Sequence, residues 1–197
     1  MYNVAILGAS GYTGVELVRL ISMHPEFKIH SLSGETKSGL KFGEVYPSLQ
    51  YLNLPHLCYV SDINYDDLDL IFCALPHTKS AAIINKLPRN IKIIDLSADF
   101  RLNTDSLYKE WYGVDHPCPD LLSKFIYGLT EFYRTDIKNS DYVACTGCNS
   151  ATGLYPIIPL VSEGIIEFDD IRSRLIPIGG AKCEAKRLPA GSLKPEH

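Results

Sequence analysis

Residues 4–14 read Val-Ala-Ile-Leu-Gly-Ala-Ser-Gly-Tyr-Thr-Gly, an apolar run followed at once by three spaced glycines. The apolar run is typical of a strand buried on both faces of a parallel sheet. The next segment carries apolar residues at helical spacing up to His24-Pro25, where proline ends the helix.

Strand, glycine turn and helix are the context of a dinucleotide fingerprint, because glycines let the backbone approach a pyrophosphate and a helix start supplies N–H donors. The spacing is G-x-x-G-x-x-G rather than G-x-G-x-x-G, but this context favours a nucleotide site over a plain glycine turn. The candidate cofactor-binding residues are Gly8, Ser10, Gly11, Tyr12, Thr13 and Gly14.

The end of a second expected strand, Lys28–Ser33, bears on the choice of cofactor. In a dinucleotide-binding fold the adenosine ribose lies at the carboxyl end of this strand. Glu35 is placed to accept a hydrogen bond from a ribose 2′-hydroxyl, which favours NAD. Ser33, with Thr36 and Lys37, would instead hold a 2′-phosphate and favour NADP. These residues alone leave both alternatives open, beside that of an ordinary polar turn.

Two more buried-strand candidates, Asp69–Ala74 and Ile91–Leu96, are separated by a short amphipathic helix at Ser80–Leu87. Strands that alternate with helices predict βαβ units, so the expected fold class is α/β, with a Rossmann-type, doubly wound parallel sheet. Two segments lack clear periodicity. We interpret residues 40–57 as a loop or irregular insertion, and residues 102–136 as an elaborated lid or as packing between lobes.

Polar residues gather where these strands end, which is where an open α/β sheet places its ligands. Pro76 and His77 follow one strand and are further candidate cofactor-binding residues, although a histidine in a loop is often simply solvated. Arg101 follows the next strand. It either binds a phosphate or carboxylate group or pairs with Asp99, and the sequence leaves both open.

The stretch Asp141–Gly153 contains the candidate nucleophile. A short apolar run, Tyr142–Ala144, predicts a strand that passes through a small-residue turn into a helix, so Cys148 lies near a helix start. Backbone N–H groups and the helix dipole favour a thiolate there, although a free cysteine is more often a small core residue. Pro156 and Pro159 fall inside this helix and predict that it starts late or kinks.

Cys145 and Cys148 form a C-x-x-C pair. No second ligand pair at suitable spacing is evident, so we expect no zinc or other metal site. A disulfide between the two thiols that switches activity off under oxidation stays open as a hypothesis. The short-chain dehydrogenases need a Tyr-x-x-x-Lys pair, and none of the twelve tyrosines has lysine four residues on, which excludes that class.

Composition narrows the classes further. A chain of 197 residues with 46% hydrophobic residues suits one large domain, or one domain and part of another. A net charge of −4 gives no electrostatic reason to expect nucleic acid or an anionic membrane as partner. No apolar run reaches the about 18 residues of a membrane span, and the N-terminus does not read as a signal peptide. The six cysteines do not resemble a disulfide framework, so we expect a cytoplasmic protein.

Several segments together resemble the N-acetyl-gamma-glutamyl-phosphate reductases of arginine biosynthesis. The resemblance covers about residues 1–170, and its motifs occur in the order Gly8–Gly14, Ala74–His77, Ile94–Leu102, Tyr127–Glu131 and Gly147–Cys148. It implies that Cys148 attacks an acyl phosphate, expels phosphate and forms a thioester, which NADPH reduces to an aldehyde. It further implies NADP rather than NAD, an acyl phosphate as the small-molecule substrate, Arg101 holding that anion, and oxyanion stabilisation around Cys148 and Asn149.

The sequence also departs from that family. Its Gly-Cys-Asn form is similar to relatives that reduce an aminoadipyl phosphate in lysine biosynthesis, which is the alternative substrate. The family carries a catalytic histidine in a His-x-His block beyond the cysteine, whereas His197 is the only histidine after Cys148 here. We therefore expect a fragment, a chain that diverges after about Arg172, or a reduced second domain; a non-catalytic nucleotide-binding module also stays open. The expected domains are an NADP-binding domain at 1–147 and part of an α+β substrate domain at 148–197, with a homo-oligomer expected of the full-length protein.

Overall fold

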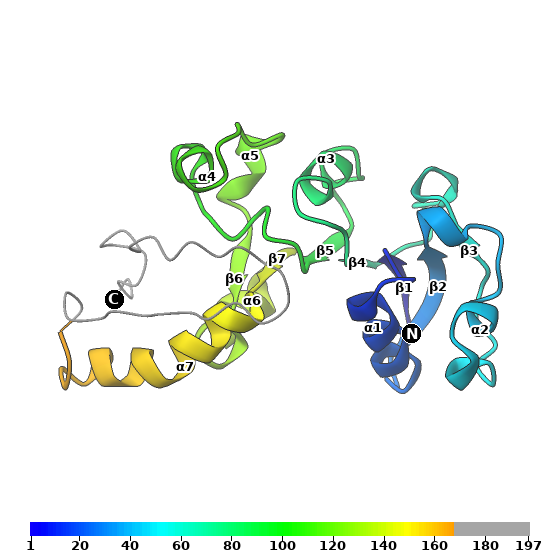
Figure 1. Cartoon of the computed structure of the whole chain (residues 1–197), viewed down its shortest axis with the longest axis horizontal. Coiled ribbons are helices and arrows are strands. Elements are labelled where there is room, and N and C mark those ends of the chain that lie inside the picture. Colours follow the sequence, from blue (N-terminus) through cyan, green and yellow to red (C-terminus); the bar gives the residue numbers. More distant parts are fainter. Residues whose placement is uncertain (168–197) are drawn as a thin grey trace. The chain divides into compact units, whose positions relative to one another are not determined.

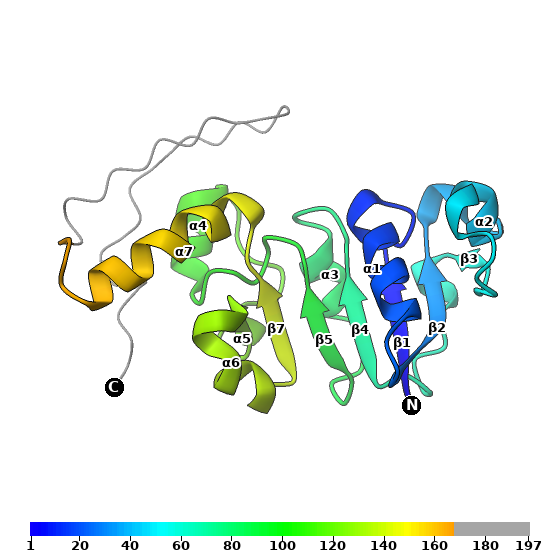
Figure 2. The same cartoon turned by 90° about the horizontal axis from the view of Figure 1, so that it is seen from below.

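The structure is a computed structural model that describes residues 1–167, and the chain divides into two units, Met1–Thr146 and one that begins at Gly147 (Figure 1). The first unit is built on a seven-stranded sheet in the order β3-β2-β1-β4-β5-β7-β6, and all paired strands are parallel (Figure 2). β2 and β3 lie on one side of β1, and β4 lies on the other side, so the direction in which strands are added to the sheet reverses between β1 and β4. This order is that of a Rossmann-type sheet, as predicted. The strands are β1 Tyr2–Leu7, β2 Phe27–Ser33, β3 Leu57–Cys58, β4 Leu70–Cys73, β5 Lys92–Asp95, β6 Ile126–Gly128 and β7 Tyr142–Cys145.

Helices cover both faces of this sheet, with α1 on one face and α3 on the other (Figure 1). The central strand β1 is accordingly apolar on both sides. Val4 and Ile6 pack in one cluster with Val18 of α1, whereas Ala5 and Leu7 belong to the cluster that contains α3. The helices are α1 Tyr12–Ser22, α2 Phe42–Val45, α3 Ser80–Ile84, α4 Asp105–Tyr112, α5 Pro119–Leu122 and α6 Thr130–Asn139, with 3-10 turns η1 Glu35–Lys37, η2 Pro47–Leu49 and η3 Val60–Asp62.

The two segments without periodicity are more regular than the sequence predicts. Residues 40–57 contain α2 and η2 and end at the edge strand β3. Residues 102–136 contain α4, α5 and the edge strand β6, and their buried side chains, among them Leu121 and Leu122, join one of the two core clusters. This segment is therefore part of the first unit's core and not a separate lid. Strands of two or three residues are too short to show a period of two, which is why the sequence did not reveal them.

The described part of the second unit consists of α7, Cys148–Ser162, and a short turn after it. The expected late start of this helix is wrong, because α7 begins at Cys148 and includes both Pro156 and Pro159. Proline has a helical φ, so each residue removes one backbone donor without stopping the helix. His197, Cys183 and most of the expected substrate domain lie outside the described residues. Within residues 1–167 no helix is long and apolar enough to cross a membrane.

The carboxyl ends of the parallel strands bring the predicted site segments to one edge of the sheet. The glycine turn follows β1, Gly34 follows β2, and residues 74–78 follow β4. Residues 96–101 follow β5, and Thr146 follows β7. The change of direction between β1 and β4 makes this edge the expected position of a ligand in an open α/β sheet.

Candidate functional site

The glycine turn between β1 and α1 is so closely packed that two of its glycines admit no side chain. Gly8 has a φ of +80°, and a Cβ atom there would lie 2.4 Å from the carbonyl oxygen of Ala74, just after β4. A Cβ atom on Gly14 would lie 2.3 Å from the Gly8 carbonyl oxygen. Gly11 is less constrained, since its nearest neighbour would be 3.4 Å away. The turn thus brings backbone where a ligand's phosphates are expected, beside the first turn of α1.

Ser10, Tyr12 and Thr13 complete this turn. Tyr12 and Thr13 form the exposed first turn of α1, and no side chain within residues 1–167 caps it. The carbonyl oxygen of Ser10 accepts a hydrogen bond of 2.8 Å from the Tyr46 hydroxyl. Tyr46 was not predicted to contact the turn, because it lies in residues 40–57, which lack clear periodicity. The N–H groups of this helix start are therefore available to an anion.

Ser33 is buried beneath the glycine turn. Its hydroxyl accepts a hydrogen bond of 3.0 Å from the Gly8 N–H, and its carbonyl oxygen accepts one of 2.7 Å from the Ala9 N–H. The next residue, Gly34, is equally confined, since a Cβ atom there would lie 2.8 Å from Ser10 Oγ. In this structure Ser33 supports the turn from below, so its predicted contact with a cofactor would come on top of that structural role.

The residues after β2 separate into two groups. The Glu35 carboxylate accepts a hydrogen bond of 3.2 Å from the Val60 N–H, so this side chain is tied to the 3-10 turn η3. Thr36 and Lys37 are exposed. Glu35 is exposed as well, so the two groups differ in that the Glu35 carboxylate has a hydrogen-bond partner in η3.

Two buried carboxylates, Asp95 and Asp99, organise the ends of β4 and β5. Asp95 Oδ1 accepts hydrogen bonds from the Ser80 hydroxyl (2.7 Å) and the Ser97 N–H (3.1 Å), and its Oδ2 accepts one from the Ser97 hydroxyl (2.6 Å). Burial raises the pKa of Asp95, and these hydrogen bonds only partly oppose it. The family resemblance includes this segment, but the sequence predicted no role for Asp95 and, for Asp99, only the alternative of a pair with Arg101.

The substitution Asp95→Asn tests this burial cost. Since the native pKa is raised, the native state binds the proton more tightly than the unfolded chain, and stability falls as pH rises through the native pKa. An asparagine keeps the shape and the acceptor for Ser80 without the charge. We expect the variant to be at least as stable as the parent chain at pH 8 and to lose that advantage below about pH 4, measured by urea unfolding across pH. A variant that is less stable at pH 8 than at pH 4, relative to the parent, would contradict the burial argument.

Pro76 and His77 lie directly after β4 and follow Ala74, whose carbonyl oxygen limits the space at Gly8. Pro76 is exposed, and the His77 side chain is about one third exposed, with Nδ1 2.5 Å from Asp99 Oδ1. The two atoms are close, but the contact does not have the geometry of a hydrogen bond. The following residue, Thr78, has a φ of +69°. His77 is thus held against a buried carboxylate, not simply solvated.

Arg101 does not pair with Asp99, so that alternative is wrong. Its Nε donates to the Cys145 carbonyl oxygen (2.8 Å) and its Nη2 to the Leu96 carbonyl oxygen (3.0 Å). The guanidinium therefore joins the ends of β5 and β7. The Tyr127 hydroxyl, 2.6 Å from Thr146 Oγ1, ties the same end of β7 to β6. Arg101 positions the chain just before Gly147, whatever else it binds.

Cys148 is the first residue of α7, and both it and Asn149 are exposed. Cys148 Sγ lies 3.9 Å from Asn149 Oδ1, and the Cys148 carbonyl oxygen accepts a hydrogen bond of 2.9 Å from the Thr152 hydroxyl. Cys145 differs, because burial raises its pKa to about 11. Both are free thiols in this structure. Cys148 is therefore the more accessible of the pair, and it lies at the start of α7, as the strand–turn–helix pattern predicted and contrary to the late start inferred from the two prolines.

These features define a class of protein. The parallel sheet, the glycine turn at its switch point and the open start of α1 are those of a dinucleotide-binding domain. The family model "Semialdehyde dehydrogenase, NAD binding domain" matches residues 3–140, and the chain belongs to this family. The first unit is accordingly an NAD(P)-binding domain.

Relatives agree with this family. The chain is 54% identical over 169 residues to an N-acetyl-gamma-glutamyl-phosphate reductase of Cereibacter sphaeroides, which covers 86% of this chain and 49% of the relative. It is 51% identical over 170 residues to the reductase of Ruegeria pomeroyi, with 86% and 50% covered. The chain thus spans about half the length of the curated relatives it matches. Among solved structures, aspartate semialdehyde dehydrogenase with NADP from Candida albicans matches 83% of this chain and 47% of its own at 18% identity and a TM-score of 0.55, a likeness that shows the fold alone.

Proposed function

We propose that this chain is the cofactor-binding and cysteine-bearing part of an N-acetyl-gamma-glutamyl-phosphate reductase, which converts an N-acetylated acyl phosphate into N-acetylglutamate semialdehyde and phosphate. The observation that carries the proposal is the 54% identity with reductases of that name over 169 residues, a length that must include Cys148. The turn and the open start of α1 fit a dinucleotide, because Gly8 and Gly14 allow the tight backbone packing of the turn and the uncapped helix start offers N–H donors to phosphates.

Cys148 is the proposed nucleophile. Its thiolate attacks the acyl carbon, the bond from that carbon to the phosphate oxygen breaks, and inorganic phosphate leaves, so that a thioester forms on Sγ. A helix start favours the negative charge that this sulfur carries before attack and after release. Backbone N–H groups at the same helix start, with the Asn149 side chain, would stabilise the oxyanion that forms at the acyl oxygen. NADPH, when bound, supplies the hydride that reduces the thioester.

Arg101 is the proposed cation for the anionic substrate. It is half-buried and fixed by two carbonyl groups, so its charge is held at the carboxyl edge of the sheet without a free search of rotamers. A fixed guanidinium attracts a phosphate more effectively than a flexible surface side chain, because less entropy is lost on binding.

NADP is the proposed cofactor. Glu35, Thr36 and Lys37 are all exposed at the end of β2, but one oxygen of the Glu35 carboxylate, which would favour NAD, already accepts a hydrogen bond from the Val60 N–H. We expect Lys37→Ala to weaken NADPH binding by about tenfold and to leave NADH binding within about twofold, because only NADPH carries the 2′-phosphate. Titration of cofactor fluorescence measures both. Equal losses for NADPH and NADH would point to a general electrostatic effect instead.

The reaction itself is tested in the oxidative direction. We expect phosphate-dependent reduction of NADP by N-acetylglutamate semialdehyde, followed at 340 nm. The corresponding aminoadipate semialdehyde, tested beside it, addresses the alternative substrate. NADPH binding without turnover of either aldehyde would contradict the proposed activity and favour a nucleotide-binding module.

A further inference from the structure

The turn after β4 is strained. Thr78 is the one described residue other than glycine with a positive φ, at +69°. A β-branched residue is rarely found in this conformation, and it persists only where the surroundings hold it. Strained residues concentrate at ligand-binding positions, which directs attention to what holds this turn.

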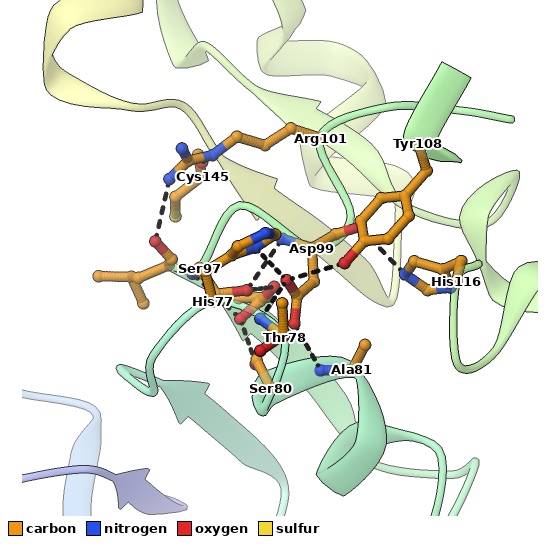
Figure 3. A network of polar contacts seen from close by, with 12 residues as sticks. His77, Thr78, Ser80, Ala81, Ser97, Asp99, Arg101, Tyr108, His116 and Cys145 are labelled. Atoms are coloured by element: carbon orange, nitrogen blue, oxygen red, sulfur yellow. Dashed lines mark hydrogen bonds and ion pairs between the residues drawn. The ribbon is translucent and has the colours of Figure 1, made fainter. Parts of the chain in front are cut away.

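Asp99 holds it. This carboxylate is fully buried, and its Oδ1 accepts a hydrogen bond of 2.8 Å from the Thr78 N–H while its Oδ2 accepts one of 2.9 Å from the Ala81 N–H (Figure 3). The His77 Nδ1 lies 2.5 Å from the same Oδ1. One buried side chain therefore fixes three successive parts of the segment: the imidazole, the strained residue and the first turn of α3.

Asp99 is itself immobilised from behind. Its N–H donates to the Ser97 hydroxyl (3.1 Å), and its carbonyl oxygen is 3.1 Å from His116 Nε2. On the other side, the ring of Tyr112 packs against that of His77, with centroids 4.3 Å apart. The imidazole is thus confined on one edge by a carboxylate and on one face by an aromatic ring, while about a third of it is exposed.

We propose that Asp99 is a positioning residue for His77: it keeps a proton on Nδ1 and leaves Nε2 as the nitrogen that contacts the dinucleotide. A free neutral imidazole carries its proton on either nitrogen, and a carboxylate against Nδ1 selects the form protonated there. This inference rests on the proposed cofactor site beside the glycine turn. It assigns a role to an aspartate that touches neither cofactor nor substrate.

The variant Asp99→Asn tests the inference, with Asp95→Asn as a matched control. Both aspartates are fully buried, Asp95 at the end of β5 and Asp99 in the loop that follows it, but only Asp99 contacts His77. An amide has one acceptor oxygen and no charge, so it cannot accept from both Thr78 and Ala81, and it presents no carboxylate to His77 Nδ1. We expect nitrogen-15 NMR of the parent chain at pH 8 to show His77 protonated at Nδ1. We expect Asp99→Asn to lose that signature and to bind NADPH about tenfold more weakly, whereas Asp95→Asn keeps both.

A third variant separates positioning from general damage. If Asp99 acts through His77, the double variant with His77→Ala should bind NADPH no more weakly than His77→Ala alone. A parent chain protonated at Nε2 would overturn the inference, even if Asp99→Asn fails to fold. So would an Asp99→Asn protein that binds NADPH within about twofold of the parent. Failure of the parent to bind NADPH would contradict the proposed function, and the NMR signature would still decide the role of Asp99.

Discussion

Replacing Gly14 by alanine is expected to destabilise the first unit by about 3 kcal/mol or more and to abolish NADPH binding. The added methyl group would lie 2.3 Å from the Gly8 carbonyl oxygen and 2.6 Å from Ala9 Cα. Both neighbours are backbone atoms of the glycine turn. The Ser33 hydroxyl and the Ala74 backbone hold this turn in place. Neither can move aside as a flexible side chain would, so the helix and the turn must separate. Urea unfolding measures the first effect and fluorescence titration the second.

Gly11→Ala is the control for this prediction. It changes a glycine of the same turn, but its methyl group would meet only the Gly8 carbonyl oxygen, at 3.4 Å, and its φ of −88° suits any residue. We expect a stability change within about 1 kcal/mol. Equal destabilisation by both variants would show that the turn fails for a reason other than the contact at Gly14.

Replacing Cys148 by serine is expected to lower the phosphate-dependent reduction of NADP at least about 1000-fold. A serine hydroxyl at neutral pH is a far weaker nucleophile than a thiolate, and α7 offers it no adjacent base among residues 148–162. Because Cys148 is exposed at the start of α7, the change should leave the fold intact. A second measurement isolates the covalent step: the parent chain mixed with an acyl phosphate should gain the mass of one acyl group, and the variant should not.

Cys145→Ser is the matched control for the nucleophile. Cys145 is three residues earlier, half-buried, and holds its proton because burial raises its pKa to about 11. We expect this variant to keep acylation and activity within about threefold of the parent. Retention of the acyl adduct in Cys148→Ser, with loss in Cys145→Ser, would reverse the assignment.

The sequence revealed those parts of the fold that depend on local pattern. The apolar run of β1, the glycines after it and the helical spacing of α1 predict one βα unit, because burial on both faces and a tight turn each demand particular residue types. The two edge strands β3 and β6 were not predicted, because strands this short pair through tertiary packing and show no alternation of apolar and polar residues.

The candidate site shows the same division. The glycine turn and the cysteine at a helix start were visible, because their chemistry depends on neighbours in the chain. The roles of Asp95 and Asp99 were not, since nothing in the local sequence tells that a carboxylate will be buried against the turn after β4. The predicted pair of Arg101 with Asp99 was wrong for a similar reason. The partners of Arg101 are backbone carbonyl oxygens at the ends of two strands, and every residue has such a group, so the sequence does not reveal them.

The contact between Gly8 and Ala74 has a consequence for folding kinetics. The glycine turn lies in the first residues of the chain, yet its packing depends on the backbone of Ala74, just after β4. When only β1, α1 and β2 have folded, the glycine turn therefore lacks its contact with Ala74. Contacts between distant parts of a chain form late, because the intervening chain loses conformational entropy before such contacts can stabilise the fold. NADPH binding should accordingly appear only in the last kinetic phase of refolding, after helical structure has already formed.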